Sequence, residues 1–448
     1  MEKRSLMIHQ QKAVTYLQEN RKKGYGGALF MEMRLGKTLT MIRFLESEPE
    51  FKKAPILILC PNSVKYTWGF ELEEEGIIDY LVVQGTRKQK EEDLQYEYRY
   101  VICNYESAER LELHLYTWGA IVADESIYMA NPKANISKYL LRNFSLTSYR
   151  YILCGNPAPE SALQYFNQMM FYYGSFMSCN NYWSYREHYF NKDYSGYKWY
   201  IKPKLKTKIY KEIRREAFTL TREEAGVGSK KFYQKLKVPT TKKQMKAYYQ
   251  MKENFEADGI STKYAPVKVM FMHKIAGGSN LKMDSWHSRE KMKLLLELVK
   301  FEYPNQKILV WFKYLHEIRE VSRYLTYHDV PALTIFGEDP IEERKRKREI
   351  FFKDPSLQIC CMTIKSMRTG IDMSIADTAI YYSNEFSWDL RSQSEDRIIS
   401  PKQKKPKMFI DLCSDKTVDF DIVDLLRGKK INSRFFMSAL YEKILERK

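Results

Sequence analysis

Short runs of apolar residues, many of them β-branched, recur along the chain and alternate with segments of amphipathic, helix-like pattern. Four runs precede residue 160 and five follow residue 300. They are PILILC (55–60), YVIC (100–103), GAIVA (119–123), RYILC (150–154), KILVWF (307–312), PALTIF (331–336), LQICCMT (357–363), DTAIYY (377–382) and KMFIDLC (407–413). Such runs are typical of parallel strands buried on both faces. The pattern predicts an α/β protein with two sheets, each covered by helices on both faces.

A basic stretch separates the two strand-rich blocks. Residues 181–250 contain 18 Lys or Arg, 6 Asp or Glu and 15 aromatic residues, and the whole chain of 448 residues carries a net charge of +18. Such a balance suits a polyanion, most simply nucleic acid. We expect most of the rings to lie in a core. The lysines either form a solvated face or hold phosphates.

Several features indicate a soluble, cytoplasmic protein. No apolar run reaches the roughly 18 residues of a membrane span, and MEKRSLMIHQ lacks the apolar core of a signal peptide. The seven cysteines form no CxxC pair and several lie in strand-like runs, so we expect buried, reduced thiols and no structural metal.

The segment LFMEMRLGKTLTMIRFL (29–45) contains the end of a phosphate-binding loop, Gly36-Lys37-Thr38, followed by an amphipathic segment. A loop that begins a helix aims backbone N–H groups at a phosphate, Lys37 would reach the β- and γ-phosphates, and Thr38 would hold Mg²⁺. By itself this tripeptide is weak evidence, because GKT also occurs by chance and Met31 stands where the consensus has its first glycine.

A second element, WGAIVADES (118–126), places Asp124 and Glu125 at the end of a buried strand. A carboxylate at this position can hold the Mg²⁺ that bridges the phosphates, and a neighbouring glutamate can orient and deprotonate water. The alternative is two solvated acids. A strand that runs into Asp-Glu about 90 residues after GKT favours a nucleotide site.

Taken in order, these segments resemble superfamily 2 helicases and translocases, and among them the Swi/Snf-like branch. The resemblance covers nearly the whole chain in eleven consecutive motifs. They are HQQKAVTYL (9–17, the Q motif), MEMRLGKT (31–38, the phosphate loop), ILCPNSVKYTWGFEL (58–72, motif Ia), VICNYES (101–107, motif Ib), VADES (122–126, motif II), RYILCGNPAPES (150–161, motif III), AFTLTREEAGV (217–227), KILVWFKYLHEI (307–318, motif IV), TIFGEDPIEERKRKREIF (334–351), IKSMRTGIDMSIADTAIYY (364–382, motif V) and QSEDRIISPKQKKP (393–406, motif VI).

The resemblance implies two RecA-like P-loop lobes. Lobe 1 would span residues 1–235, with a basic helical insertion at about 160–215, between motifs III and IV. Lobe 2 would span residues 236–448, with a helical start at about 240–295. It also implies ATP and Mg²⁺ as cofactors and DNA as a sequence-independent partner, bound by a chain that is monomeric and needs no membrane.

The resemblance assigns residues to both ligands. The catalytic set would be Lys37, Asp124, Glu125, Gln393 and Arg397. The nucleotide would be bound by Gln10, Arg34, Gly36, Lys37, Thr38, Gly370 and Asp372, with Mg²⁺ on Thr38 and Asp124. One DNA strand would be held by Ser63, Lys65, Trp68, Asn104, Tyr105, Thr363, Lys365 and Ser366.

Three positions depart from the family pattern. Arg34 replaces a loop glycine, so either it costs about 1 kcal/mol in a tight turn or it lies outside that turn. Ser400 replaces the second arginine of motif VI, which leaves Arg397 as the expected arginine finger and Arg368 and Arg391 as substitutes. Asn156 replaces the motif III threonine, and we expect this replacement to alter the coupling between ATP hydrolysis and DNA binding.

The expected function is an ATP-dependent helicase acting on branched DNA, such as forks and Holliday junctions, in replication, recombination or repair. The small size, without reader modules, is typical of phage or bacterial members, so the host cytoplasm is the expected location. Three alternative functions would use some of the same residues. They are a double-strand translocase that remodels protein–DNA complexes, a non-catalytic clamp derived from a motor, and a P-loop small-molecule kinase. Motifs IV to VI and the positive charge fit the kinase poorly.

Overall fold

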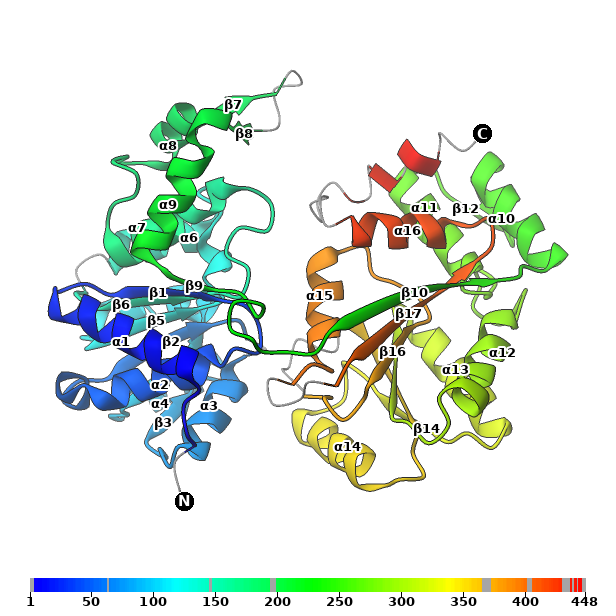
Figure 1. Ribbon diagram of the computed structural model, residues 1–448, viewed down its shortest axis with the longest axis horizontal. Coiled ribbons are helices and arrows are strands. Elements are labelled where there is room, and N and C mark those ends of the chain that lie inside the picture. The colour runs from blue at the N-terminus through cyan, green and yellow to red at the C-terminus, as the bar shows by residue number, and fades with distance from the viewer. Residues whose placement is uncertain are drawn as a thin grey trace. The chain divides into compact units, whose positions relative to one another are not determined.

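The computed structural model describes residues 4–62, 64–144, 147–193, 199–364, 372–400 and 405–428, together with 436, 439–440 and 442–444. The chain divides into two compact units, Met1–Val227 and Gly228–Lys448 (Figure 1). Strand β10 (Lys231–Val238) pairs in parallel with β17 (Lys407–Ser414) along its whole length, so it belongs to the second unit. The boundary predicted at 235/236 falls inside this strand and is corrected to 227/228.

The first unit is built on a seven-stranded sheet in which every pairing is parallel. Its order is β3-β4-β2-β5-β6-β1-β9. The strands are β1 (Gly27–Met31), β2 (Ile56–Cys60), β3 (Tyr80–Val82), β4 (Tyr100–Asn104), β5 (Ala120–Asp124), β6 (Arg150–Leu153) and β9 (Phe218–Leu220). The four predicted strands of this block are present. The edge strands β3 and β9 were not predicted, because three residues give too short a pattern.

Helices cover both faces of this sheet. Alternate residues of β2 point to opposite sides, so Ile56 and Ile58 pack in one core while Leu57 and Leu59 pack in the other. The first core includes helices α1 (Ile8–Lys22), α2 (Lys37–Ser47) and α3 (Lys65–Glu74). The second includes α5 (Tyr105–Arg110), α6 (Asn135–Asn143) and α7 (Tyr165–Tyr173), and α4 (Arg87–Asp93) follows β3 in the chain.

The stretch predicted as a basic insertion, about 160–215, includes α7, and the part after α7 extends away from the first sheet (Figure 1). It consists of α8 (Tyr182–Tyr189), an antiparallel pair β7 (Phe190–Lys192) and β8 (Trp199–Ile201), and α9 (Lys206–Glu216). Tyr185, Tyr189 and Phe190 are buried, whereas Trp183 and Tyr200 are 46% and 58% exposed. Rings therefore serve both as core and as surface.

The second unit has a six-stranded parallel sheet in the order β10-β17-β16-β13-β15-β14. Its other strands are β13 (Ile308–Phe312), β14 (Ala332–Ile335), β15 (Ile359–Thr363) and β16 (Thr378–Tyr381). Two cores lie on its faces, one with α12 (Glu290–Glu297) and α13 (Leu315–Tyr327), the other with α14 (Ile341–Lys353) and residues around α15 (Trp388–Asp396). The α/β fold with two parallel sheets is thereby confirmed.

The helical start of the second unit forms a separate small core. Helices α10 (Lys242–Asn254), α11 (Ala265–Ala276) and α16 (Val418–Arg427) pack together, and a short hairpin of β11 (Glu256–Ala257) and β12 (Ile260–Ser261) joins the first two. In the described parts of the chain, no helix has both the length and the apolar character to cross a membrane. All seven cysteines are buried and free.

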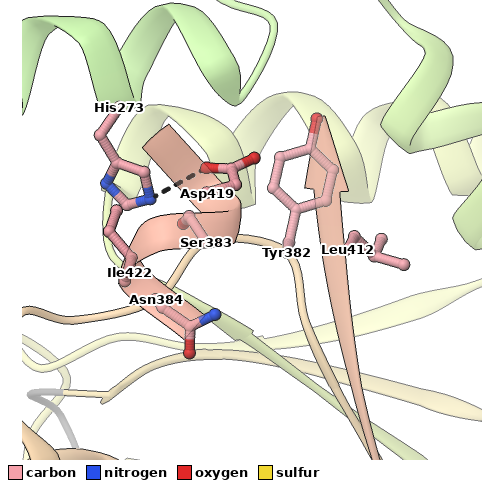
Figure 2. Close-up of a pocket in the computed structure, with 7 residues that line it drawn as sticks. All are labelled: His273, Tyr382, Ser383, Asn384, Leu412, Asp419 and Ile422. Carbon is pink, nitrogen blue, oxygen red and sulfur yellow. Dashed lines mark ion pairs between the residues drawn. The ribbon is translucent and has the colours of Figure 1, made fainter. Parts of the chain in front are cut away.

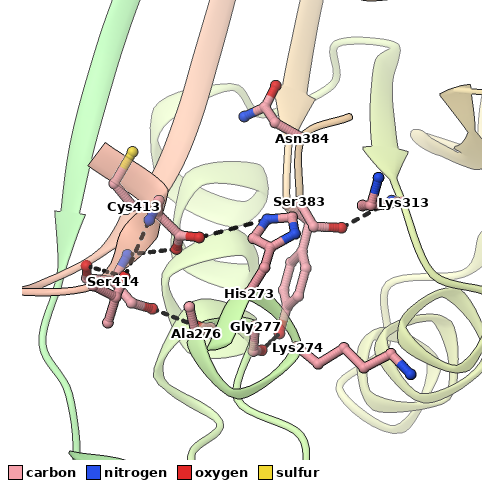
Figure 3. A network of polar contacts seen from close by, with 12 residues as sticks. His273, Lys274, Ala276, Gly277, Lys313, Ser383, Asn384, Cys413 and Ser414 are labelled. Atoms are coloured by element: carbon pink, nitrogen blue, oxygen red, sulfur yellow. Dashed lines mark hydrogen bonds and ion pairs between the residues drawn. The ribbon is translucent and has the colours of Figure 1, made fainter. Parts of the chain in front are cut away.

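A buried polar network ties this helical core to the sheet (Figures 2 and 3). The Asp419 carboxylate of α16 lies 2.7 Å from Lys291 Nζ and 3.6 Å from His273 Nε2. Ser414 Oγ, at the end of β17, donates to the carbonyl of Ala276 at 2.7 Å. Burial, reinforced by nearby lysines, keeps the pKa of His273 well below its usual range, so the ring is neutral at pH 7.

Glu317, on α13, is the other carboxyl group of this network. It is fully buried and accepts a hydrogen bond from Ser383 Oγ. Burial raises its pKa to about 7; Asp419 acts in the same direction, while Ser383 and Lys291 oppose the shift. A carboxyl group with an ordinary pKa of 4.5 is therefore held partly protonated near neutral pH.

This shift predicts a pH dependence of stability. Below pH 4.5 the Glu317 carboxyl is protonated in both states. Between that pH and about 7 the unfolded chain loses the proton that the folded chain keeps, so rising pH favours unfolding by up to about 3 kcal/mol. The change Glu317→Gln should remove this slope and raise the free energy of unfolding at pH 8, measured by urea denaturation at several pH values. The change Glu320→Gln, on the same helix, should leave the slope in place; an unaltered slope in Glu317→Gln would contradict the prediction.

Candidate nucleotide-binding site

The phosphate loop connects β1 to α2 at the carboxyl edge of the first sheet. Helix α2 begins at Lys37, and its N-cap Gly36 has a φ of 76°. Arg34 also has a positive φ, 70°, so it lies inside the tight turn and adopts the conformation that a glycine would take freely. This resolves the alternative left by the sequence: the replacement costs about 1 kcal/mol of backbone strain. The first N–H groups of α2 face away from the helix body, as an anion site requires.

The side chains of His9 and Gln10, on α1, both contact the backbone of this loop at Leu35. Gln10 Oε1 accepts the N–H of Met7 at 2.8 Å, and its Nε2 donates to the carbonyl of Leu35 at 3.4 Å. His9 Nε2 lies 3.1 Å from the same carbonyl. A Cβ on Gly36 would lie 2.1 Å from Gln10 Nε2, so the Gln10 amide would have to leave the loop, and the φ of 76° also favours glycine there. The amide of Gln10 is thus engaged by the loop, and its role as an adenine contact stays a prediction.

Three strand ends meet at this loop, because β1, β6 and β5 are neighbours in the sheet. Lys37 Nζ donates to the carbonyl of Met31 at 2.9 Å. A Cβ on Gly155, just after β6, would lie 3.5 Å from Lys37 Nζ. Asp124 is the last residue of β5 and feels the positive charge of Lys37. The predicted loop lysine, motif II aspartate and motif III glycine are therefore adjacent.

Asp124 is buried and has two hydrogen-bond donors of its own. Trp68 Nε1 donates to Oδ2 at 2.9 Å and the N–H of Glu125 donates to Oδ1 at 2.9 Å. Burial raises the pKa of Asp124, while Lys37 and these donors counteract the shift. A buried carboxylate fits Mg²⁺, which takes few protein oxygens together with phosphate oxygens, and the hydroxyl of Thr38, next to Lys37 in the chain, is the second candidate ligand. These residues would hold the metal if nucleotide is bound.

Glu125 follows in a left-handed backbone conformation, with a φ of 51°. Its side chain is half-buried, and Cys154 Sγ lies 3.7 Å from Oε2. The turn separates the two carboxylates, so that one is buried and the other partly open. This arrangement suits one metal ligand and one group that handles water.

Three of the predicted DNA-binding side chains are corrected, because they are buried in the nucleotide lobe. Lys65 donates to the carbonyl of Val83 at 2.7 Å, and burial lowers its pKa. Trp68 is fully buried against Asp124. Tyr105 donates to the carbonyl of Asp124 at 2.6 Å. The sequence pattern placed these residues in DNA motifs, but Trp68 and Tyr105 support Asp124 at the end of β5, and Lys65 holds the segment that follows β3.

The remaining predicted DNA residues divide into three groups. Asn104 is half-buried and donates to Glu106 at 2.9 Å, so it stays a candidate. Thr363, at the end of β15, is only 7% exposed, which leaves its side chain little access to DNA and corrects that prediction. Ser63, Lys365 and Ser366 lie outside the described residues, as do the predicted nucleotide residue Gly370 and the substitute finger Arg368.

Replacing Trp68 by phenylalanine keeps a buried ring and removes only the donor to Asp124. Partners of this kind typically contribute 10- to 100-fold to metal affinity or activity. We expect Trp68→Phe to raise the Mg²⁺ concentration needed for half-maximal ATP hydrolysis by about tenfold, measured by titrating Mg²⁺ at fixed ATP. Trp118→Phe is the matched control, because Trp118 is also buried but donates to the carbonyl of Leu113. Equal effects of the two changes would contradict the assignment.

In the second unit, the structure places the predicted residues around α15. Gln393 and Arg397 are half-buried at the end of this helix. The carbonyl of Arg397 accepts the N–H of Met373 at 3.0 Å, and Asp372 precedes that residue. Arg348 Nε donates to the carbonyl of Asp372 at 2.7 Å. Motif V and motif VI are thus joined through the backbone.

Arg391 is corrected as a substitute finger. Its side chain is 3% exposed, and its guanidinium lies 2.9 Å from Glu395 and is bonded to Asn384 and Asp411. The group also lies 3.4 Å from the centroid of the Tyr381 ring. An arginine held in this way is part of the interior.

The described geometry defines a P-loop nucleotide-binding lobe followed by a second parallel α/β lobe. The family described as the SNF2-related domain matches residues 9–300. The chain therefore belongs to the SNF2-related family, a class of ATP-using domains, as the order of its motifs predicted.

Several known proteins are similar to this chain. The ISWI chromatin-remodeling complex ATPase CHR11 of Arabidopsis thaliana is 21% identical over 426 residues, which are 90% of this chain and 40% of that protein. Chromatin structure-remodeling complex subunit snf21 of Schizosaccharomyces pombe is 23% identical over 442 residues, 89% of this chain and 36% of that protein. The Sulfolobus solfataricus SWI2/SNF2 ATPase core in complex with dsDNA aligns over 99% of this chain and 95% of that chain, with a TM-score of 0.47 and 19% identity.

The chain spans only part of its curated relatives. It matches 7% of the length of the chromatin-remodeling ATPase INO80 of Cryptococcus neoformans, at 25% identity over 124 residues, or 28% of this chain.

What the sequence did not reveal is the support around the two acidic residues, Asp124 and Glu125. Trp68 and Tyr105 were assigned to DNA, and no pattern singled out Gln168, which lies on α7.

Proposed function

We propose that this chain is a DNA-stimulated ATPase that moves along DNA, and that branched DNA is its preferred substrate, as in a phage or bacterial branch-migration helicase. The observation that carries the ATPase is the meeting of Lys37, Asp124 and Gly155 at three adjacent strand ends. Family membership supports the same activity.

The chemistry follows from these residues. Lys37 and the N-terminal amides of α2 would hold the phosphates, and Thr38 with Asp124 would hold Mg²⁺. Mg²⁺ would neutralise charge on the phosphate oxygens. Glu125 would orient a water for attack and accept its proton. By the family resemblance, Arg397 and Gln393 of the second unit would complete the site, so that nucleotide binding and release change the grip on DNA.

The insertion of the first unit supports a DNA-binding role. Four basic side chains on or just before α9 are exposed and, among the described residues, have no carboxylate within ion-pair distance; they are Lys204, Lys206, Lys211 and Arg214. Tyr210, on the same helix, is 40% exposed. Unpaired cations suit phosphates, and exposed rings suit bases that are unstacked at a fork. We call these four basic residues the α9 cationic face.

Neutralising the α9 cationic face with glutamine should weaken DNA binding without changing sequence preference. For every DNA phosphate that is no longer neutralised, the slope of log affinity against log salt should become shallower by about 0.9. Fluorescence anisotropy with a fork and with duplex, at several salt concentrations, measures both quantities. The control neutralises four exposed lysines elsewhere in the first unit, Lys12, Lys22, Lys23 and Lys52. An identical slope in both variants would show that this face makes no specific contact.

A second candidate is a double-strand translocase that remodels protein–DNA complexes without separating strands. The names of the relatives favour it, because CHR11 and INO80 are called chromatin-remodeling ATPases. A third, a non-catalytic clamp, draws its support from the strained Arg34 and from Ser400. The three candidate functions share the same nucleotide-binding lobe and differ in which DNA, if any, stimulates its ATP hydrolysis.

The deciding experiment measures ATP hydrolysis without DNA and with single strand, duplex, fork and four-way junction. The wild type is compared with Lys37→Ala and with Lys88→Ala, which removes the same charge from an exposed site of the same unit. Stimulation by the branched substrates, absent in Lys37→Ala and retained in Lys88→Ala, supports the proposal. Equal stimulation by plain duplex supports the remodelling translocase. No hydrolysis above the Lys37→Ala background on any DNA supports the clamp.

A further inference from the structure

A single buried amide joins the acidic turn after β5 to the loop after β6. Ser126 Oγ donates to Gln168 Oε1 at 2.6 Å. Gln168 Nε2 donates to the carbonyl of Pro157 at 2.6 Å and to that of Gln164 at 2.8 Å. Both Ser126 and Gln168 are fully buried. The amide cannot be reversed, because Oε1 would then face two carbonyl oxygens.

The two segments that this amide joins are those nearest the reacting groups. Ser126 directly follows Glu125, the residue expected to handle water. Pro157 lies in the loop that contains Gly155, next to Lys37 Nζ. A shift of the loop would break buried hydrogen bonds unless the turn moved with it, and such bonds are costly to leave unmade. The turn and the loop therefore move together.

Gln168 also lies on the element that leads to the proposed DNA-binding insertion. Helix α7 carries Gln168, and the chain continues from α7 into α8, β7, β8 and α9.

We propose that Gln168 is a positioning residue that transmits DNA binding on the insertion to Glu125, through α7 and Ser126. This rests on the proposed ATPase function and adds to it the route by which DNA stimulates the reaction. Because the amide of Gln168 is engaged by Ser126, Pro157 and Gln164, its loss should change how strongly DNA accelerates hydrolysis while ATP affinity stays the same.

The test uses Ser126→Ala, Gln168→Met and the double variant in the full chain. Each is measured for kcat and KM for ATP, with and without saturating fork DNA, and for Tm. Asn167→Leu is the matched control: Asn167 is equally buried on the same helix, but its amide donates to the carbonyl of Met129 at 3.1 Å and does not reach the loop.

We expect the ratio of DNA-stimulated to basal kcat to fall about tenfold in each single variant, with KM changed less than about twofold. The double variant should be no worse than the singles, because all remove one link. An unchanged ratio in Ser126→Ala and Gln168→Met, or an equal loss in Asn167→Leu, overturns the inference while leaving the ATPase intact. Absence of hydrolysis in the wild type overturns the proposed function, and this inference with it.

Discussion

Replacing Arg397 by alanine should lower DNA-stimulated ATP hydrolysis by about 10³-fold or more, the range attributed to an arginine finger. Ser400 removes one of the two arginines that the family places in motif VI, and Arg391 is committed to the interior. Arg397, half-buried at the C-cap of α15, therefore stays the predicted finger of this segment, and by the family resemblance it would act on the γ-phosphate. KM for ATP should change far less than kcat, because the finger acts mainly on the charge of the transition state.

Steady-state hydrolysis with saturating fork DNA, together with Tm, checks this expectation. Arg397→Lys keeps the charge but loses the planar fork, so it should recover only a small part of the rate. Arg289→Ala, at a half-exposed site of the same unit paired with Glu320, is the control and should retain full activity. Activity of Arg397→Ala above about a tenth of the wild type would assign the finger elsewhere.

Replacing Arg391 by alanine should act on stability rather than on chemistry. Asp411 is fully buried; burial would raise its pKa, but Arg391 outweighs this and holds the pKa below its usual range, with Asn384 and Arg427 assisting. Removing the arginine leaves the buried carboxylates of Asp411 and Glu395 short of their partner, which typically costs 3–5 kcal/mol. Urea denaturation of the full chain measures the loss.

Two further variants separate the pair from a surface effect. Arg346→Ala breaks an exposed ion pair with Glu343 and should cost about 0.5 kcal/mol or less. Arg391→Met combined with Asp411→Leu removes both charges and should recover much of the stability that the single variant loses, because the unpaired charge is gone. A loss below about 1 kcal/mol in Arg391→Ala would show that the network is not a main support of the second unit.

The sequence determined the strands and the order of the motifs. Continuous apolar runs such as ILILC and ILVWF, which alternate with helical segments, predict strands that are buried on both faces of a parallel sheet. The helix after GKT begins at Lys37, as its amphipathic pattern indicated. The three-residue edge strands and β10 escaped prediction, because half-exposed edges carry no continuous apolar pattern.

The sequence also predicted that Lys37, Asp124 and Glu125 lie at one edge of the first sheet, because the segments that follow parallel strands meet there; their roles in hydrolysis stay predictions. It misassigned Lys65, Trp68 and Tyr105, since a motif fixes the position of a residue along the chain and not the direction of its side chain. Arg391 was misjudged for the same reason: its place beside motif VI suggested a substitute finger, and only the buried Asp411 shows where its charge is neutralised.

What only the tertiary structure decided is the environment of those groups. Two contacts join segments that are far apart in the chain: the indole of Trp68 on Asp124, and the bridge from Ser126 through Gln168 to Pro157. The left-handed backbone of Arg34 is likewise visible only in the folded loop. The sequence by itself determined which chemistry the chain carries, because strand ends and glycine positions follow from local pattern. The fold determined how that chemistry is supported, because burial and hydrogen-bond partners depend on contacts between distant segments.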